Sequence, residues 1–168
     1  MIIAFDVQYA DNQAKAVAIT FQNWEDAAPN ETIIKYVDGI ADYEPGAFYK
    51  RELPCILSIL KDIDLATIDL IIIDGYVLLD DFGKLGLGGH LYEISSIKIP
   101  IIGVAKTKFL QNSQNAIEVF RGKSKNPLFV SAIGIDLETA ADAVRKMHGE
   151  FRFPTLLKLL DDVTKEKV

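Results

Sequence analysis

The feature that most constrains the fold of this sequence is a short apolar run between two acids, Asp69-Leu-Ile-Ile-Ile-Asp74. Residues 70–73 are far too few to span a bilayer. A wholly apolar run of this length is typical of a strand that is buried on both faces of a parallel sheet. The sequence therefore predicts a sheet flanked by helices, which is an α/β fold.

The residues before this run predict an antiparallel part of the same sheet. Residues 2–9 are apolar and rich in β-branched side chains, which indicates a strand, and Asp11-Asn12 indicates a turn after it. Further apolar patterns predict strands at 17–21 and 32–37. Three strands joined by short turns form an antiparallel meander, so we expect a mixed sheet.

The remaining elements alternate between strands and helices. Residues 100–105 indicate another buried strand, and a late strand pair is expected at 117–120 and 128–131. Helices are expected in four places: from near Pro54 to residue 63, over 90–97, from an N-cap at Asp136 through Met147 with Gly149 ending it, and after Pro154.

The size and the cysteine content bound the kind of protein. A chain of 168 residues fits a single domain over 1–168 and buries a sizeable core without disulfides. Cys55 is the only cysteine, which excludes an internal disulfide and a cysteine-based zinc site. Residues 1–6 carry no basic segment and reach an acid early, so we expect no signal peptide, no membrane association and a cytoplasmic protein.

The net charge of −6 argues against strong nonspecific binding of nucleic acid. It does not exclude a nuclease, because acids gathered around a metal lower the total charge without preventing a local basic groove. Scattered, solvated lysines are the simpler interpretation of the basic residues. Three spots nevertheless qualify as parts of a groove: Lys50-Arg51, Lys106 with Lys108, and Arg121 with Lys123 and Lys125.

Two acids stand in apolar strands, where a carboxylate is costly. Asp6 interrupts the first strand, and Asp74 closes the buried strand at its carboxyl end. Buried carboxylates are usually paired, hydrogen-bonded or bound to metal. Carboxyl ends of strands are also where ligands bind in α/β sheets. Position alone leaves two interpretations open, a ligand site and a pair of turn or helix caps.

Several segments resemble motifs of the endonuclease V family, and they keep the family's order along almost the whole chain. The ordered set is specific where a single motif is not. The matching segments are Phe5 to Tyr9, Tyr43 to Pro54 (with the family's Tyr-x-Pro-Gly and Arg-Glu-x-Pro elements), Ile73-Asp74-Gly75, Gly86 to Leu91, Ile102 to Lys106, Phe129 to Ser131, Leu137 to Ala140 and Phe151 to Pro154.

The resemblance implies a ribonuclease H-like fold and metal-dependent hydrolysis of a phosphodiester near a deaminated purine, chiefly inosine, in DNA or RNA. It implies that Asp6 and Asp74 are metal ligands and that Glu52 and Asp161 complete the metal's surroundings. Asp6, Glu52, Asp74 and Lys106 would be the catalytic residues, with Lys106 approaching the scissile phosphate. Hard oxygen ligands suit Mg²⁺ or Mn²⁺.

The resemblance also implies contacts with nucleic acid. Tyr43, Pro45 and Gly46 would form an exposed turn against the nucleic acid, since an exposed tyrosine stacks on unpaired bases. His90, in the Gly-rich segment, would be a further nucleic-acid-binding residue. The sequence does not indicate an oligomeric state.

This chain departs from the family pattern after Asp74. The family's Ala-His-Pro-Arg element is missing, and Asp80 stands near the place of its histidine. Glu44 replaces an aliphatic residue beside Tyr43. An aspartate near the scissile phosphate would repel the substrate, so we expect weakened cleavage with Mg²⁺. The alternative is a loop that points Asp80 into solvent.

Three functions remain in competition. The first is a metal-dependent endonuclease that acts on inosine-containing nucleic acid. The second is a diverged homologue that binds nucleic acid without cutting it, or that cuts another substrate. The third is a non-catalytic interaction domain in which the acids are caps and turns. If the four carboxylates do not converge in the structure, the third is favoured.

Overall fold

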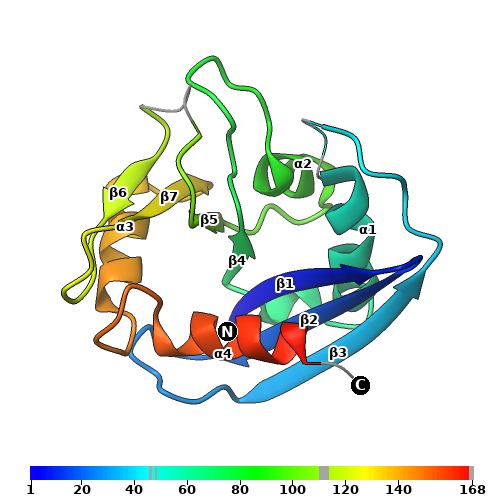
Figure 1. Ribbon diagram of the computed structural model, residues 1–168, viewed down its shortest axis with the longest axis horizontal. Helices are drawn as coiled ribbons and strands as arrows, with labels where there is room; N and C mark the ends of the chain where they lie inside the picture. Colours follow the sequence, from blue (N-terminus) through cyan, green and yellow to red (C-terminus); the bar gives the residue numbers. More distant parts are fainter. Residues whose placement is uncertain (46, 48, 110–113, 167–168) are drawn as a thin grey trace.

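The computed structural model describes residues 1–45, 47, 49–109 and 114–166. Within these residues the strands form one mixed sheet in the order β3-β2-β1-β4-β5-β7-β6, with helices on both faces (Figure 1). The elements in chain order are β1 (Ile2–Ala10), β2 (Gln13–Phe21), β3 (Glu31–Asp38), α1 (Tyr49–Leu60), the 3-10 turn η1 (Leu65–Thr67), β4 (Leu70–Asp74), α2 (Leu87–Ile94), β5 (Ile101–Ala105), β6 (Ile117–Val119), β7 (Leu128–Ile133), α3 (Leu137–Lys146) and α4 (Thr155–Lys165).

The strand pairing confirms the mixed sheet. β1, β2 and β3 form the antiparallel meander. β4 lies between β1 and β5 and is parallel to both, so the apolar run is the buried parallel strand that its composition predicts. β7 lies between β5 and the edge strand β6 and is antiparallel to both. In the described part of the chain, no helix is long and apolar enough to cross a membrane.

Alternation along β1 divides the core into two layers. Ile2 and Ala4 pack on the layer formed with α3 and α4. Ile3 and Phe5 pack on the opposite layer, formed with α1 and α2. Each fully buried isoleucine or phenylalanine side chain contributes about 1.5–3 kcal/mol to folding. Because side chains alternate along a strand, Asp6 points to the same face as Ala4, the face that α4 covers.

Helix α1 begins at Tyr49, so the prediction that it starts near Pro54 is wrong. The free energy gained from side-chain contacts of the first turns outweighs the loss of the backbone hydrogen bond that Pro54 cannot donate. The Tyr49 ring stacks on His90 with centroids 3.6 Å apart, and the Arg51 guanidinium lies 4.0 Å from the centroid of the Tyr9 ring.

Helix α2 begins at Leu87, three residues before the predicted start at His90. The backbone of the preceding loop lies so close that only glycine fits. A Cβ on Gly89 would lie 2.7 Å from the carbonyl oxygen of Val77, and one on Gly88 would lie 2.8 Å from a Val77 methyl carbon. The glycines therefore allow close packing of the helix, whereas in the sequence they indicate a loop.

The two C-terminal helices confirm the prediction. The Asp136 carboxylate caps α3 by accepting the Thr139 backbone N–H at 3.1 Å. Pro154 immediately precedes α4, where a proline costs no helical hydrogen bond. Figure 1 shows α4 running alongside β1 and β2, which brings its side chains to the carboxyl end of the sheet's centre.

Ser131 ties β7 to the loop that follows β4, and it generates a stability prediction. Its hydroxyl accepts the buried backbone N–H of Val77 at 2.9 Å. Ser131→Ala leaves that N–H without a partner, which costs about 1–3 kcal/mol. We expect the melting temperature to fall by roughly 3–10 °C, whereas Ser96→Ala, at an exposed serine, changes it little. Equal melting temperatures for both variants would contradict this role.

Candidate active site

The register of the parallel strands brings three charged residues to one edge of the sheet. Phe5 pairs with Ile73, so the next residues, Asp6 and Asp74, lie side by side where β4 ends. Asp74 pairs with Val104, and Lys106 follows two residues later, on the same face.

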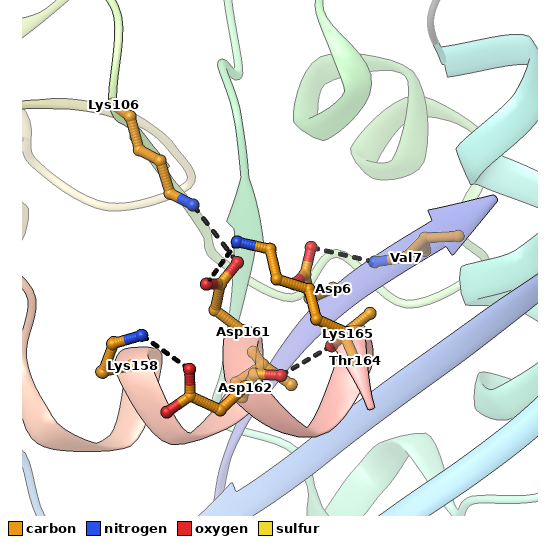
Figure 2. Close-up of polar contacts among 9 residues, drawn as sticks. Asp6, Val7, Lys106, Lys158, Asp161, Asp162, Thr164 and Lys165 are labelled. Carbon is orange, nitrogen blue, oxygen red and sulfur yellow. Dashed lines mark hydrogen bonds and ion pairs between the residues drawn. The ribbon is translucent and has the colours of Figure 1, made fainter. Parts of the chain in front are cut away.

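Helix α4 adds a carboxylate to this edge. Asp6, Asp74, Lys106 and Asp161 line one cavity between the sheet and α4. Figure 2 shows the Asp161 side chain pointing from α4 toward the amino groups of Lys106 and Lys165, with Asp6 nearby. Lys106 Nζ lies 3.3 Å from Oδ1 of Asp161, and Lys165 Nζ lies 2.8 Å from Oδ2.

Glu52 approaches from the opposite face of the sheet. It lies in the first turn of α1 and lines an adjoining cavity together with Asp6 and Asp74. Asp6 and Asp74 therefore separate two cavities, one that contains Asp161 and one that contains Glu52. The structure brings the four predicted carboxylates and Lys106 to one region, and the acids cap neither a turn nor a helix there.

Burial and mutual repulsion raise the pKa values of the inner carboxyls. For Glu52, burial and then the charges of Asp74 and Asp6 raise the pKa to about 8. For Asp6, burial and then Asp74 raise the pKa to about 6, although the Val7 backbone N–H and the Thr164 hydroxyl oppose this. Although part of Asp74 reaches solvent, burial also raises its pKa, against the opposing charge of Lys106.

Asp161 differs from these three groups. Burial works to raise the pKa of its carboxyl, but the hydrogen bonds from Lys165 and Lys106 outweigh burial and lower it. The two lysines therefore favour the ionised form of Asp161, whereas burial disfavours it in the other three carboxyls.

The inner carboxylates fit a divalent cation by their chemistry. Among the described residues, neither Glu52 nor Asp74 receives a hydrogen bond or ion pair, and Asp6 accepts the N–H of its neighbour Val7 at 3.0 Å. Carboxylate oxygens without other donors are the ligands that Mg²⁺ and Mn²⁺ prefer. Yet in the described ranges no three acidic, histidine or cysteine side chains stand close enough together to hold one ion. A shared metal requires these side chains to move.

The described residues predicted to bind nucleic acid line neither of the two carboxylate cavities. Tyr43 and Pro45 are exposed before α1, and the side chain of Tyr43 is 57% exposed. Gly46 lies outside the described residues. His90 stacks on Tyr49, so its ring joins α2 to α1.

Asp80 organises its own loop. Its Oδ1 accepts the backbone N–H groups of Phe82 at 2.9 Å and Lys84 at 3.0 Å. The carboxylate is thus directed into a turn of the backbone, and it does not line either of the two carboxylate cavities.

Sequence reasoning missed three residues that support the site. Thr164 and Lys165 follow Asp161 by three and four residues, the spacing that places helical side chains on one face. Arg152 donates hydrogen bonds to the backbone carbonyls of Lys106 at 2.5 Å and Pro127 at 2.8 Å, which fixes the chain at Lys106. The i+3 and i+4 spacing was the available signal for the first two.

The predicted basic spots have different environments. Arg121 is buried and donates to three carbonyls, those of Met147, Gly149 and Phe151, so it stabilises the α3–α4 connection and is not part of a basic groove. Lys123 and Lys125 are exposed nearby.

The raised pKa of Glu52 generates a pH prediction for the metal-free protein. Between the unfolded value of 4.5 and the folded value of about 8, the folded state binds the extra proton. Stability therefore falls as pH rises through this window. Glu52→Gln stays neutral, so it should stabilise the protein at pH 8.5 by about 1 kcal/mol or more, roughly 2–4 °C in melting temperature.

At pH 4.5 the same variant and the wild type should melt at similar temperatures. Glu118→Gln, at an exposed position in β6, serves as the matched control and should show no comparable pH-dependent gain. If Glu52→Gln changes the melting temperature equally at both pH values, Glu52 is not under charge repulsion.

Comparison with known proteins bears on the identity of this site. The family model described as endonuclease V matches residues 1–123. An endonuclease V of Pyrococcus horikoshii is 29% identical over 171 residues, covering 99% of this chain and 74% of the relative. An endonuclease V of Nostoc punctiforme is 25% identical over 177 residues, covering 94% and 78%.

Solved structures give the same result for the fold. The catalytic domain of human endonuclease V superposes with a TM-score of 0.75 at 21% identity, over 98% of this chain and 80% of that one. Endonuclease V of Ciona intestinalis, in complex with a DNA that contains an inosine followed by a ribo-adenosine, gives a TM-score of 0.80 at 19% identity, over 98% and 83%.

These likenesses confirm the ribonuclease H-like fold. The match to the family model covers most of the chain and includes β1, α1, β4 and β5, which carry Asp6, Glu52 and Asp74 and lead into Lys106. The chain belongs to the endonuclease V family of nucleases.

Proposed function

We propose that this protein is a metal-dependent endonuclease that hydrolyses phosphodiester bonds near deaminated purines, chiefly inosine, in nucleic acid. The observation that carries the proposal is the pair Asp6, in the middle of β1, and Asp74, at the carboxyl end of the adjacent parallel strand β4, with Lys106 beyond the next strand. The Ciona relative, which is bound to an inosine-containing DNA, supports this substrate class.

The carboxylates would hold one or more divalent ions, Mg²⁺ or Mn²⁺, through Asp6 and Asp74, with Glu52 and Asp161 completing the surroundings. When bound, such an ion polarises a phosphate oxygen and lowers the pKa of an attacking water. Lys106 would offset the negative charge that builds on the phosphate. Its backbone is fixed by Arg152, so its ammonium moves on its flexible stem alone.

Binding of the nucleic acid falls to residues outside the carboxylate cavities. We propose that Tyr43, Pro45 and Gly46 contact it, with the exposed Tyr43 ring stacking on a base. His90 would contribute from the adjoining helix end, while its ring remains stacked on Tyr49.

A second candidate is a diverged homologue that binds nucleic acid without cutting it, or that cuts another substrate. The observation that favours it is Asp161, which is paired with two lysines, while no three of the described acidic, histidine or cysteine side chains stand close enough together to hold one ion. The two candidates differ in whether inosine-containing nucleic acid is cleaved, and both bind nucleic acid.

A cleavage assay with matched variants separates them. Inosine-containing single- and double-stranded DNA and RNA are incubated with wild-type protein and Mg²⁺ or Mn²⁺. We expect cleavage that Asp74→Asn lowers by about 100-fold or more, because it removes a charged metal ligand. Asp69→Asn, at the opposite end of the same strand, should retain wild-type rates. Tight binding of these nucleic acids, with no cleavage of any of them in Mg²⁺ or Mn²⁺, would establish the second candidate.

Asp80 gives a separate prediction about substrate repulsion. Asp80→Asn removes the charge but keeps an Oδ1 that accepts both loop N–H groups. Because the carboxylate is directed into its own turn, we expect single-turnover cleavage rates within about twofold of wild type. A rise of tenfold or more would show that the Asp80 charge opposes the substrate phosphate and weakens this nuclease.

A further inference from the structure

Both oxygens of the Asp161 carboxylate are occupied by lysine ammonium groups. Lys106 Nζ contacts Oδ1 at 3.3 Å and Lys165 Nζ contacts Oδ2 at 2.8 Å. Figure 2 shows the two amino groups converging on this one side chain from a strand end and from α4. The Asp161 side chain is 16% exposed, so little water competes for its oxygens.

The two lysines are held differently. The backbone of Lys106 is fixed by Arg152, and its ammonium also lies 4.8 Å from the centroid of the Phe153 ring. Lys165 stands at the end of α4 with 57% of its side chain exposed. Lys165 can therefore leave Asp161 for solvent by a simple change of rotamer, whereas Lys106 stays within the cavity.

We propose that Lys165 is a built-in counter-cation of Asp161, and that a divalent metal recruits Asp161 only by displacing the Lys165 ammonium. This inference rests on the proposed metal-dependent function. Lys165 acts on the metal through Asp161, so it is a positioning residue that sets the affinity of the site for metal.

The geometry explains why the four carboxylates line neighbouring cavities without closing on one ion. An ammonium and a divalent cation compete for the same carboxylate oxygen, so a resident ammonium reduces the apparent affinity for metal to the intrinsic affinity multiplied by the fraction of molecules in which Asp161 is unpaired. The positive charge of Lys165 also repels a metal bound near Asp6 and Asp74. Removing the lysine should therefore strengthen metal binding, the opposite of what loss of a merely structural ion pair does.

The test measures Mn²⁺ binding to the full chain by electron paramagnetic resonance of the free ion, at pH 7.5 and low salt. Lys165→Met should bind Mn²⁺ about three- to tenfold more tightly than wild type. Lys165→Arg, which retains the cation, should remain near wild type. High salt screens the exposed ammonium and should reduce the difference in Mn²⁺ affinity between Lys165→Met and wild type.

Lys158→Met is the matched control. Lys158 lies on the same helix and pairs with Asp162 at 2.6 Å across the same four-residue spacing, and in Figure 2 this pair is separate from the Lys106–Asp161–Lys165 contacts. Its loss should leave the Mn²⁺ affinity unchanged. Thermal melting of each variant checks that the fold is intact.

The outcomes separate this inference from the proposed function. Wild type that binds Mn²⁺ together with a folded Lys165→Met that binds no more tightly would overturn the role of Lys165 alone. Absence of Mn²⁺ binding in both proteins would overturn the metal site itself. Binding by Lys165→Met but not by wild type would support the inference in its strongest form.

Discussion

The site depends on the parallel register of β1 and β4, which places a carboxylate from the middle of β1 beside the one that ends β4. The pairing of Phe5 with Ile73 leaves Asp6 and Asp74 as neighbours where β4 ends. Strands in a sheet are about 4.8 Å apart, so these charges repel each other in partly buried surroundings. The surrounding arrangement offsets this repulsion: Lys106 beyond β5, the Thr164 hydroxyl, and the proton that Glu52 retains at neutral pH.

Much of the fold could be predicted because local patterns and tertiary demands agree. The apolar run after Asp69 is a buried parallel strand in both the sequence and the structure, and Asp136 caps the helix that its position predicts. The start of α1 could not be predicted, because Pro54 indicates a boundary that the contacts of Tyr49 and Arg51 override.

The residues of the candidate site were also only partly predictable from the sequence. Asp6 and Asp74 could be singled out because a carboxylate in an apolar strand is costly unless it is paired, hydrogen-bonded or bound to metal, and the family resemblance then favoured a ligand site. For Thr164 and Lys165 the only signal was their spacing from Asp161, because on an amphipathic helix they look like ordinary solvated residues. Only the packing of α4 along β1 brings them to the acids. The family match ends at residue 123, so this helix lies beyond the segment that it covers.

The central claim is that the carboxylates at this sheet edge form a site for a divalent cation. The most direct measurement is a crystal structure of the protein with Mn²⁺, with anomalous scattering used to locate the ion. The account predicts an anomalous peak within about 2.0–2.4 Å of carboxylate oxygens of both Asp6 and Asp74. A peak elsewhere in protein that cleaves nucleic acid, or none at saturating Mn²⁺, would contradict it.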